Sequence, residues 1–197
     1  MKLFANHQRK NEPQPALFLD RDGVINIDKG YVHLIKDFDF FEDIFQIIRN
    51  ANKLNYLVIV VTNQAGIGRG YYSISQFEEL TKWMIGKFEK KHAKIDGIYF
   101  SPFHPENGIG KFLKKENTRK PGFGMFLEAC QDFNIDIDNS IMIGDKISDL
   151  EASSNFGITK NYLFNSSKKS FQNKRNIIFK QLNSLLSIED LILDFYQ

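Results

Sequence analysis

The chain has 197 residues, of which 42% are hydrophobic and 25% charged, and its formal net charge is +2. This length and composition are typical of one soluble globular domain with a substantial core. The net charge is too small to indicate a nucleic-acid or membrane-surface partner, and a single cysteine, Cys130, excludes an internal disulfide. Because no apolar run has the length of a membrane span or of a signal peptide, we predict a cytoplasmic protein.

The N-terminal residues differ in composition from the rest of the chain. Residues 6–15 are polar and contain two prolines, so we predict a flexible leader over residues 1–15 and a single domain over residues 16–197. Apolar runs predict buried strands over residues 16–19, 56–61, 97–100, 140–143 and 158–164.

Helical patterns lie between these predicted strands. Apolar residues at helical spacing follow Asp43, and Ser75 with Glu78 forms a capping-box pattern ahead of a second apolar stripe. Residues 126–133 predict a third helix, a fourth ends at Gly157, and one or two helices are predicted over residues 177–196, after a polar surface loop. Strands that alternate with helices predict an α/β fold whose mainly parallel sheet is flanked by helices.

Polar residues follow the predicted strands at the places where each strand ends. Asp20 and Asp22 come directly after the first buried run and project to the same side. Aspartates also favour turns, so this pair alone has a purely structural alternative. Parallel sheets bind ligands beyond the carboxyl ends of their strands, which predicts one composite site. The other members of that set are Thr62, Asn63, Arg119, Lys120, Asp145, Lys146 and Asp149.

These residue types suit phosphoryl chemistry. A set of oxygen ligands without histidine or cysteine favours Mg²⁺ over zinc. Lysine and threonine can stabilise the charged oxygens of a phosphoryl group during its transfer. We predict that Asp20 accepts the phosphoryl group as an aspartyl phosphate. Asp22 would then protonate the leaving oxygen and later deprotonate the attacking water.

Four ordered motifs resemble those of the haloacid dehalogenase (HAD) superfamily of phosphatases. They are FLDRDG at 18–23, VVTNQ at 60–64, RKPG at 119–122 and IGDKISD at 143–149. The segments at 24–33, 62–72, 101–106 and 119–125 are similar to the D-glycero-D-manno-heptose 1,7-bisphosphate 7-phosphatases, to which histidinol-phosphate phosphatases are related. The resemblance covers roughly residues 16–165 and implies a Rossmann-like fold with a minimal cap.

The resemblance also implies a role for each matching residue. Asp20 would be the nucleophile, Asp22 the proton donor, and Mg²⁺ would be held by Asp20, Asp145 and the backbone carbonyl of Asp22. Thr62 and Lys120 would stabilise the transferring phosphoryl group. The substrate would be bound by Asp28, Lys29, Gly30, Tyr31, Asn63, Gln64, Ala65, Arg119 and Lys146. The family resemblance further suggests a monomer.

One loop departs from the pattern of this family. Many members hold a structural zinc through cysteine and histidine ligands in the segment before the RKP motif. The corresponding positions here are Ser101, Phe103, Glu116 and Thr118, and His104 does not match a ligand position. These residues cannot complete a tetrahedral Cys₃His site, so we predict no structural zinc. We expect packing of Phe103 and Phe112 to hold the loop instead.

The leading functional hypothesis is an enzyme, a Mg²⁺-dependent phosphatase that removes the 7-phosphate of a heptose 1,7-bisphosphate in nucleotide-activated heptose biosynthesis. Alternatives are a phosphatase for histidinol phosphate or another small phosphate ester, a polynucleotide 3′-phosphatase, and a catalytically silent binding module. The DKGYVH segment favours heptose over histidinol phosphate. The low net charge and the absence of a kinase P-loop argue against a polynucleotide substrate. The preferred anomer stays open.

Overall fold

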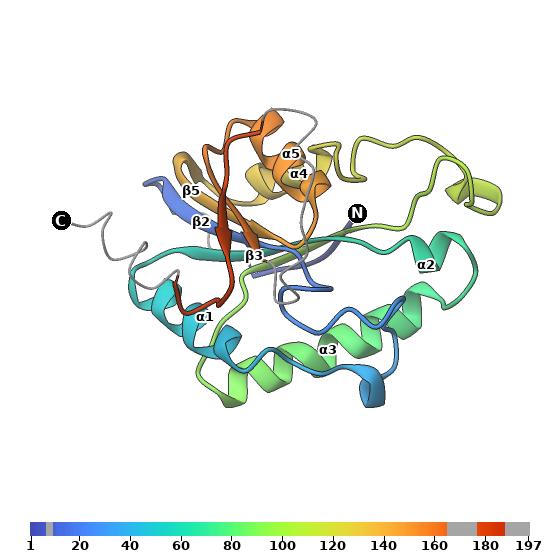
Figure 1. The fold of residues 1–197 in the computed structure, drawn as a ribbon, viewed down its shortest axis with the longest axis horizontal. Helices are drawn as coiled ribbons and strands as arrows, with labels where there is room; N and C mark the ends of the chain where they lie inside the picture. Colours follow the sequence, from blue (N-terminus) through green and yellow to red (C-terminus); the bar gives the residue numbers. More distant parts are fainter. Residues whose placement is uncertain (7–9, 165–176, 188–197) are drawn as a thin grey trace.

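A twisted central sheet organises the protein (Figure 1). The computed structural model describes residues 1–6, 10–164 and 177–187. Within these ranges the sheet has seven strands in the order β1-β4-β3-β2-β5-β6-β7. β1 pairs antiparallel with β4, and every other neighbouring pair is parallel. In chain order the strands are β1 (Lys2–Ala5), β2 (Gln14–Leu19), β3 (Leu57–Asn63), β4 (Gly97–Ser101), β5 (Ile135–Gly144), β6 (Lys160–Phe164) and β7 (Lys180–Leu182).

Helices cover both faces of this sheet, as Figure 1 shows. α1 (Asp43–Lys53) and α3 (Ile74–Lys90) lie on one face, while α4 (Gly124–Asp132) and α5 (Ile147–Phe156) lie on the other. α2 (Ala65–Gly68) is a single turn directly after β3, and short 3-10 helices occupy Ile35–Asp37 and Gly110–Phe112. The predicted α/β fold with a mainly parallel, helix-flanked sheet is therefore confirmed.

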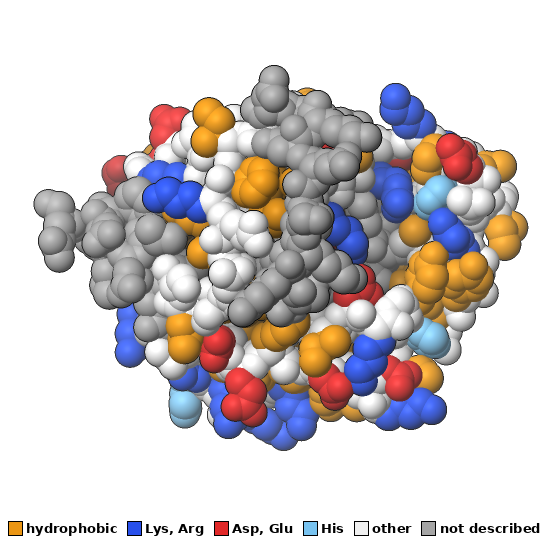
Figure 2. All heavy atoms as spheres, in the orientation of Figure 1, with side chains coloured by type: hydrophobic (Ala, Val, Ile, Leu, Met, Phe, Trp, Pro, Cys, Tyr) orange, Lys and Arg blue, Asp and Glu red, His pale blue; other side chains and the backbone are white. Residues whose placement is uncertain are grey.

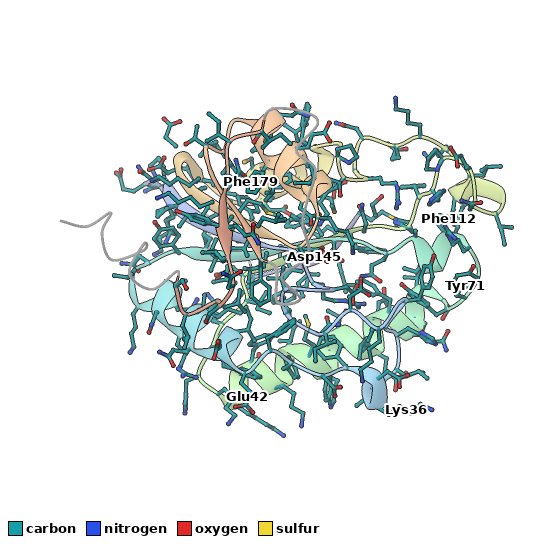
Figure 3. The ribbon with its side chains drawn as sticks, in the orientation of Figure 1. Lys36, Glu42, Tyr71, Phe112, Asp145 and Phe179 are labelled. Carbon is teal, nitrogen blue, oxygen red and sulfur yellow. The ribbon has the colours of Figure 1, made fainter. Side chains whose placement is uncertain are left out.

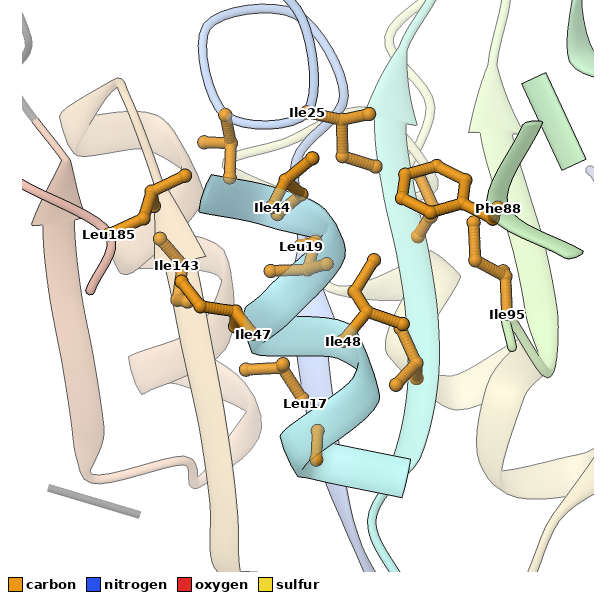
Figure 4. Close-up of a cluster of buried hydrophobic side chains, with 14 of the residues drawn as sticks. Leu17, Leu19, Ile25, Ile44, Ile47, Ile48, Phe88, Ile95, Ile143 and Leu185 are labelled. Atoms are coloured by element: carbon orange, nitrogen blue, oxygen red, sulfur yellow. The ribbon is translucent and has the colours of Figure 1, made fainter. Parts of the chain in front are cut away.

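The central strand β2 contributes side chains to two separate cores. Leu17 and Leu19 pack with α1 on one face, as Figure 4 shows, whereas Phe18 packs with Phe126 on the other. Residues 16–19 are fully buried because helices cover both sides of the strand. This double burial explains why the predicted strands appear in the sequence as unbroken apolar runs instead of alternating ones.

The start of α3 differs from the predicted capping box. The N-cap residue is Ser73, whose hydroxyl accepts a hydrogen bond from the Gln76 amide at 3.1 Å. The Gln76 side chain accepts in return from the Ser73 amide at 2.8 Å. The assignment to Ser75 and Glu78 was wrong because SxxQ and SxxE patterns overlap here, and the earlier one closes the box. The predicted C-cap at Gly157 is confirmed by its left-handed φ of 113°.

Both ends of the described chain add edge strands that the sequence did not indicate. The prediction of a flexible leader over residues 1–15 is wrong for residues 2–5, since β1 pairs with β4 and Leu3 and Phe4 pack on the core. It is also wrong for residues 14–15, which begin β2 and pair with β5. The prediction of one or two helices over residues 177–196 is wrong for residues 180–182, because Lys180–Leu182 forms β7. Residues 188–197 and the predicted surface loop 165–176 lie outside the described residues. No helix in the described ranges is long and apolar enough to cross a membrane.

Candidate active site

A cavity of about 480 Å³ opens at the carboxyl ends of the parallel strands. β2, β3 and β5 end here, and each is followed directly by one of the polar motifs. The topology therefore brings together residues that are 100 positions apart in the sequence, such as Asp20 and Lys120. Most of the predicted site residues line the cavity: Asp20, Asp22, Asp28, Gly30, Tyr31, Asn63, Gln64, Ala65, Arg119, Lys120 and Lys146.

Lys120 is buried at the bottom of this site. Its ammonium group lies 2.7 Å from Asp20 Oδ1 and 2.7 Å from Asp149 Oδ1, and it donates to the Val61 carbonyl at 2.7 Å. Burial alone would lower the pKa of Lys120, but Asp149 and Asp20 outweigh this effect and raise it. Lys120 is therefore a fixed cation beside the Asp20 carboxylate.

Asn63 holds the backbone of Lys120 in place. Its side-chain amide donates to the Lys120 carbonyl at 3.1 Å, and its Oδ1 accepts from the Lys120 amide at 3.0 Å. This pair of bonds joins the end of β3 to the RKPG motif. Asn63, predicted as a substrate-binding residue, thus uses its side chain to orient the backbone of Lys120.

The carboxyl groups of Asp145 and Asp149 lie close to that of Asp20. Among the described residues, Asp20, Asp145 and Asp149 are the acidic side chains whose ligand atoms all lie within 4.8 Å of one another. Asp145 Oδ1 is buried and lacks a hydrogen-bond partner among the described residues. Burial, with Asp20 and Asp149 nearby, raises the pKa of Asp145 to about 8. A hard divalent cation would relieve this repulsion and satisfy the orphaned oxygen, so the cluster fits Mg²⁺.

Gly23 makes room for this cluster. It adopts a φ of 95°, and a Cβ atom there would lie 2.4 Å from Asp145 Oδ2. Only glycine combines that backbone conformation with such a close approach. The glycine of the FLDRDG motif therefore allows the carboxylate of Asp145, the residue directly after β5, to lie against the loop after β2. Figure 3 labels Asp145 near the middle of the molecule.

The carboxylate of Asp22 accepts hydrogen bonds from three side chains. Arg21 approaches both of its oxygens, at 2.9 Å through Nη2, and Asn26 Nδ2 lies 3.0 Å from Oδ1. Gln64 Nε2 lies 3.0 Å from Oδ2 and 2.9 Å from Thr62 Oγ1. The environments of Asp20 and Asp22 differ, as distinct nucleophilic and acid/base roles require.

The sequence prediction missed several of these supporting residues. Arg21 lies between the two aspartates of the first motif and is almost fully buried, with its guanidinium near the Phe38 and Phe77 rings. Asp149, predicted from the sequence as part of the composite site, contacts Lys120 directly at 2.7 Å. The charge of Arg21 between two acids was a usable signal, whereas the contact of Asp149 depends on the tertiary fold.

The loop after β2 forms one wall of the cavity. Asp28 accepts from the Gly30 amide at 2.9 Å, and its carboxylate lies 3.2 Å from Lys146 Nζ. Lys146 also lies 3.5 Å from Asp145, so it connects this wall to the acidic cluster. Tyr31 has a φ of 53°, which is uncommon for a residue other than glycine. Lys29 is directed to Asp39, with which it forms a 2.6 Å ion pair.

Two arginines lie at the other end of the cavity. Arg119 donates to the Phe103 carbonyl at 3.1 Å, and burial together with the nearby Arg69 lowers its pKa. Arg69 Nη2 lies 3.1 Å from His104 Nε2, and its guanidinium lies over the Tyr31 ring. The part of the cavity that Arg69 and Arg119 line is therefore suited to an anionic group on the substrate.

Side-chain packing holds the loop in which relatives are expected to carry zinc. Phe103 and Phe112 pack with ring centroids 5.9 Å apart, which confirms the predicted contact. The Lys114 ammonium lies 4.6 Å from the centre of the Phe103 ring and pairs with Glu116 at 2.6 Å. Ser101 Oγ and Thr118 Oγ1 are 3.3 Å apart. The four residues at the positions expected for zinc ligands, Ser101, Phe103, Glu116 and Thr118, thus make other contacts. That the protein binds no structural zinc stays a prediction.

Sequence comparisons place these residues among known phosphatases. The profile of the polynucleotide kinase 3 phosphatase family matches residues 18–185. The chain is 54% identical over 143 residues to the D-glycero-alpha-D-manno-heptose-1,7-bisphosphate 7-phosphatase of Burkholderia mallei, covering 73% of this chain and 76% of that protein. It is 45% identical over 155 residues to the beta-anomer 7-phosphatase of Vibrio cholerae, covering 79% and 83% of the two chains.

Solved structures share the fold. A HAD-like phosphatase of Mesorhizobium loti superposes with a TM-score of 0.84 at 28% identity, covering 95% of this chain and 88% of that one. The D,D-heptose 1,7-bisphosphate phosphatase of B. bronchiseptica, solved with magnesium and phosphate, gives a TM-score of 0.76 at 20% identity over 92% and 99% of the chains. The fold expected from the four motifs is therefore confirmed.

Proposed function

The chain belongs to the HAD-type heptose-1,7-bisphosphate 7-phosphatases, and we propose that it removes the 7-phosphate of D-glycero-D-manno-heptose 1,7-bisphosphate by Mg²⁺-dependent hydrolysis. The observation that carries this proposal is the buried Asp20 carboxylate, held 2.7 Å from the Lys120 ammonium next to Asp145. Burial raises the pKa of Asp20, and Lys120 opposes that shift. The Lys120 ammonium is therefore the group that favours the anionic, nucleophilic form of Asp20 in this buried site.

The reaction proceeds in two steps. An Asp20 oxygen bonds to phosphorus as the bond from phosphorus to the sugar oxygen breaks, and Asp22 passes its proton to that leaving oxygen. Water then attacks the phosphorus of the aspartyl phosphate and gives a proton to Asp22. The bond between phosphorus and the Asp20 oxygen breaks, which releases inorganic phosphate and restores the Asp20 carboxylate. Lys120 and Thr62 stabilise the charge of the transferring oxygens.

The acidic cluster supplies the metal site in this proposal. Asp20, Asp145 and the backbone carbonyl of Asp22 would hold Mg²⁺, with Asp149 beside them. When bound, the ion neutralises charge on the phosphoryl oxygens and brings them close to Asp20. The donor set consists of oxygen atoms, which agrees with the preference of this ion.

Magnesium should stabilise the protein most at alkaline pH. Because the folded-state pKa of Asp145 is raised to about 8, its ionisation opposes folding as the pH rises from its unfolded value towards 8. Mg²⁺ at 100 times its Kd adds about 2.7 kcal/mol to the free energy of unfolding, which corresponds to a rise of roughly 5–10 °C in Tm for a chain of this size. We expect a larger Mg²⁺-induced rise in Tm at pH 8 than at pH 5.5 by thermal melting. In Asp145→Asn, most of the Mg²⁺-induced rise in Tm should be lost. An equal Mg²⁺-induced rise at both pH values in the wild type would contradict the metal assignment.

The two arginines would bind the phosphate that is not cleaved. Replacing Arg69 or Arg119 by glutamine should raise KM for the bisphosphate by about tenfold, because a hydrogen bond to a charged group is lost. KM for heptose 7-phosphate should change less than about twofold. Steady-state kinetics with both substrates measures the difference, and Arg49→Gln, on α1, is the control. Equal changes for both substrates would assign the arginines to loop structure.

A panel of substrates tests the proposed reaction. With Mg²⁺, kcat/KM should be highest for a heptose 1,7-bisphosphate, and both anomers are needed because the two relatives differ in the anomer named. Histidinol phosphate and a DNA 3′-phosphate are the competing substrates. On the described part of the face in Figure 2, acidic and basic side chains are intermixed, which does not favour a polynucleotide. Preference for either competitor would overturn the heptose assignment. A cytoplasmic monomer without membrane or nucleic-acid partners remains part of the proposal.

A further inference from the structure

The hydrogen bond from Gln64 to Asp22 depends on how the Gln64 amide is turned. With Nε2 facing Asp22 and Thr62, the amide donates to the Asp22 carboxylate at 3.0 Å and to the Thr62 hydroxyl at 2.9 Å. The opposite orientation would place the amide oxygen against a carboxylate oxygen. The same amide thus supports two groups of the site only in one of its two orientations.

Tyr72 is the residue that selects this orientation. Its hydroxyl donates to Gln64 Oε1 at 2.5 Å, so the oxygen of the amide is held on the side away from Asp22. The Tyr72 side chain is buried, and burial raises the pKa of its phenol, so it stays a donor throughout the neutral range. Thr62 Oγ1 accepts a hydrogen bond from Gln64, so the hydroxyl hydrogen of Thr62 can point to the phosphoryl group.

The Tyr72 ring is itself fixed from two sides. The His33 ring stacks on it with centroids 4.8 Å apart and planes within 6°. On α2, a Cβ atom at Gly66 would lie 2.2 Å from the Tyr72 ring, so glycine allows the ring to reach Gln64. His33 Nδ1 also lies 2.8 Å from the Tyr31 carbonyl, which connects the ring to the substrate-side loop.

We propose that Tyr72 is a positioning residue for acid/base catalysis, acting through Gln64 on Asp22. The inference rests on the proposed function, in which Asp22 protonates the leaving oxygen. Protonation matters for a sugar alkoxide, which is a poor leaving group, and hardly for p-nitrophenolate, which leaves as a stable anion. A loss of Asp22 positioning therefore shows in the leaving-group dependence of kcat/KM, which reports the steps up to release of the alcohol.

The test compares Tyr72→Phe with wild type on the heptose bisphosphate and on p-nitrophenyl phosphate, both with Mg²⁺. We expect kcat/KM for the sugar phosphate to fall about tenfold, mainly through kcat, and that for the aryl phosphate to stay within about twofold. Tyr71→Phe is the matched control, because it removes the hydroxyl of the exposed neighbouring tyrosine and should leave both values unchanged. Equal losses on the two substrates, or none, would overturn the positioning role.

Two further variants separate this inference from the proposed function. Asp22→Asn should lose about 10²–10⁴-fold on the sugar phosphate and much less on the aryl phosphate. If Asp22→Asn shows that pattern and Tyr72→Phe does not, the inference fails while the proposed function stands; if neither shows it, the acid role itself is wrong. Gln64→Met should be as impaired as the double variant with Tyr72→Phe, because the two side chains act in series. Additive losses in the double variant would contradict the proposal. The comparison of Gln64→Met with the double variant still tests the proposal if Tyr72→Phe alone folds poorly.

Discussion

Replacement of Asp20 by asparagine is expected to lower kcat by about 10⁴-fold or more on every phosphate ester, because the amide cannot take up the phosphoryl group. The fold should persist, since asparagine has the same shape and relieves repulsion with Asp145 and Asp149. Steady-state assays with Mg²⁺, together with thermal melting, measure both quantities.

A matched control for this substitution is available on the same sheet. Asp138 lies in β5 and is exposed, so Asp138→Asn removes an equal charge away from the cavity. It should leave kcat and Tm close to those of the wild type. Activity of Asp20→Asn above about 1% of wild type would exclude Asp20 as the nucleophile.

Replacement of Lys120 by methionine is expected to damage both activity and stability. Methionine keeps much of the side-chain volume but leaves Asp20 and Asp149 buried without their shared cation. Breaking a buried ion pair in this way typically costs about 3–5 kcal/mol. We also expect kcat to fall by about 10²-fold or more, because a charge contact to the transferring phosphoryl group is lost.

The pH dependence of the Lys120→Met defect gives a sharper test. Without the ammonium, which lowers the pKa of Asp20, this pKa rises further in the folded state, so the loss of stability should grow as the pH increases from 5 to 8. Denaturant unfolding at both pH values measures this difference, and Lys82→Met, on an exposed position of α3, is the control. A defect that is the same at both pH values would contradict the role of Lys120 as counter-ion.

The sheet and the main catalytic residues were accessible from the sequence for a physical reason. A strand covered on both faces must be apolar throughout, so residues 16–19 and 57–61 are visible as runs without any structural information. Because parallel strands end at one edge, the polar residues that follow them had to converge. Asp20, Lys120 and Asp145 accordingly lie within one site.

Other features depend on contacts between distant parts of the chain and left no local signal. β1 and β7 are edge strands of three or four residues, and their pairing with β4 and β6 is decided by the sheet they join. The choice of Ser73 over Ser75 as N-cap required the backbone geometry. The Tyr72–Gln64–Asp22 contacts involve residues up to 42 positions apart, so the sequence offered Gln64 only as a residue beside a strand end.

The most direct test of the account is a rapid-quench experiment under single-turnover conditions with Mg²⁺ and heptose 1,7-bisphosphate labelled with ³²P at the 7-phosphate. An aspartyl-phosphate mechanism at Asp20 predicts a transient acid-stable label on the protein that is sensitive to hydroxylamine. Borohydride reduction and peptide mapping should assign this label to Asp20. Asp20→Asn should carry no label. Release of labelled phosphate by the wild type without labelling of the protein, or label at another residue, would contradict the account.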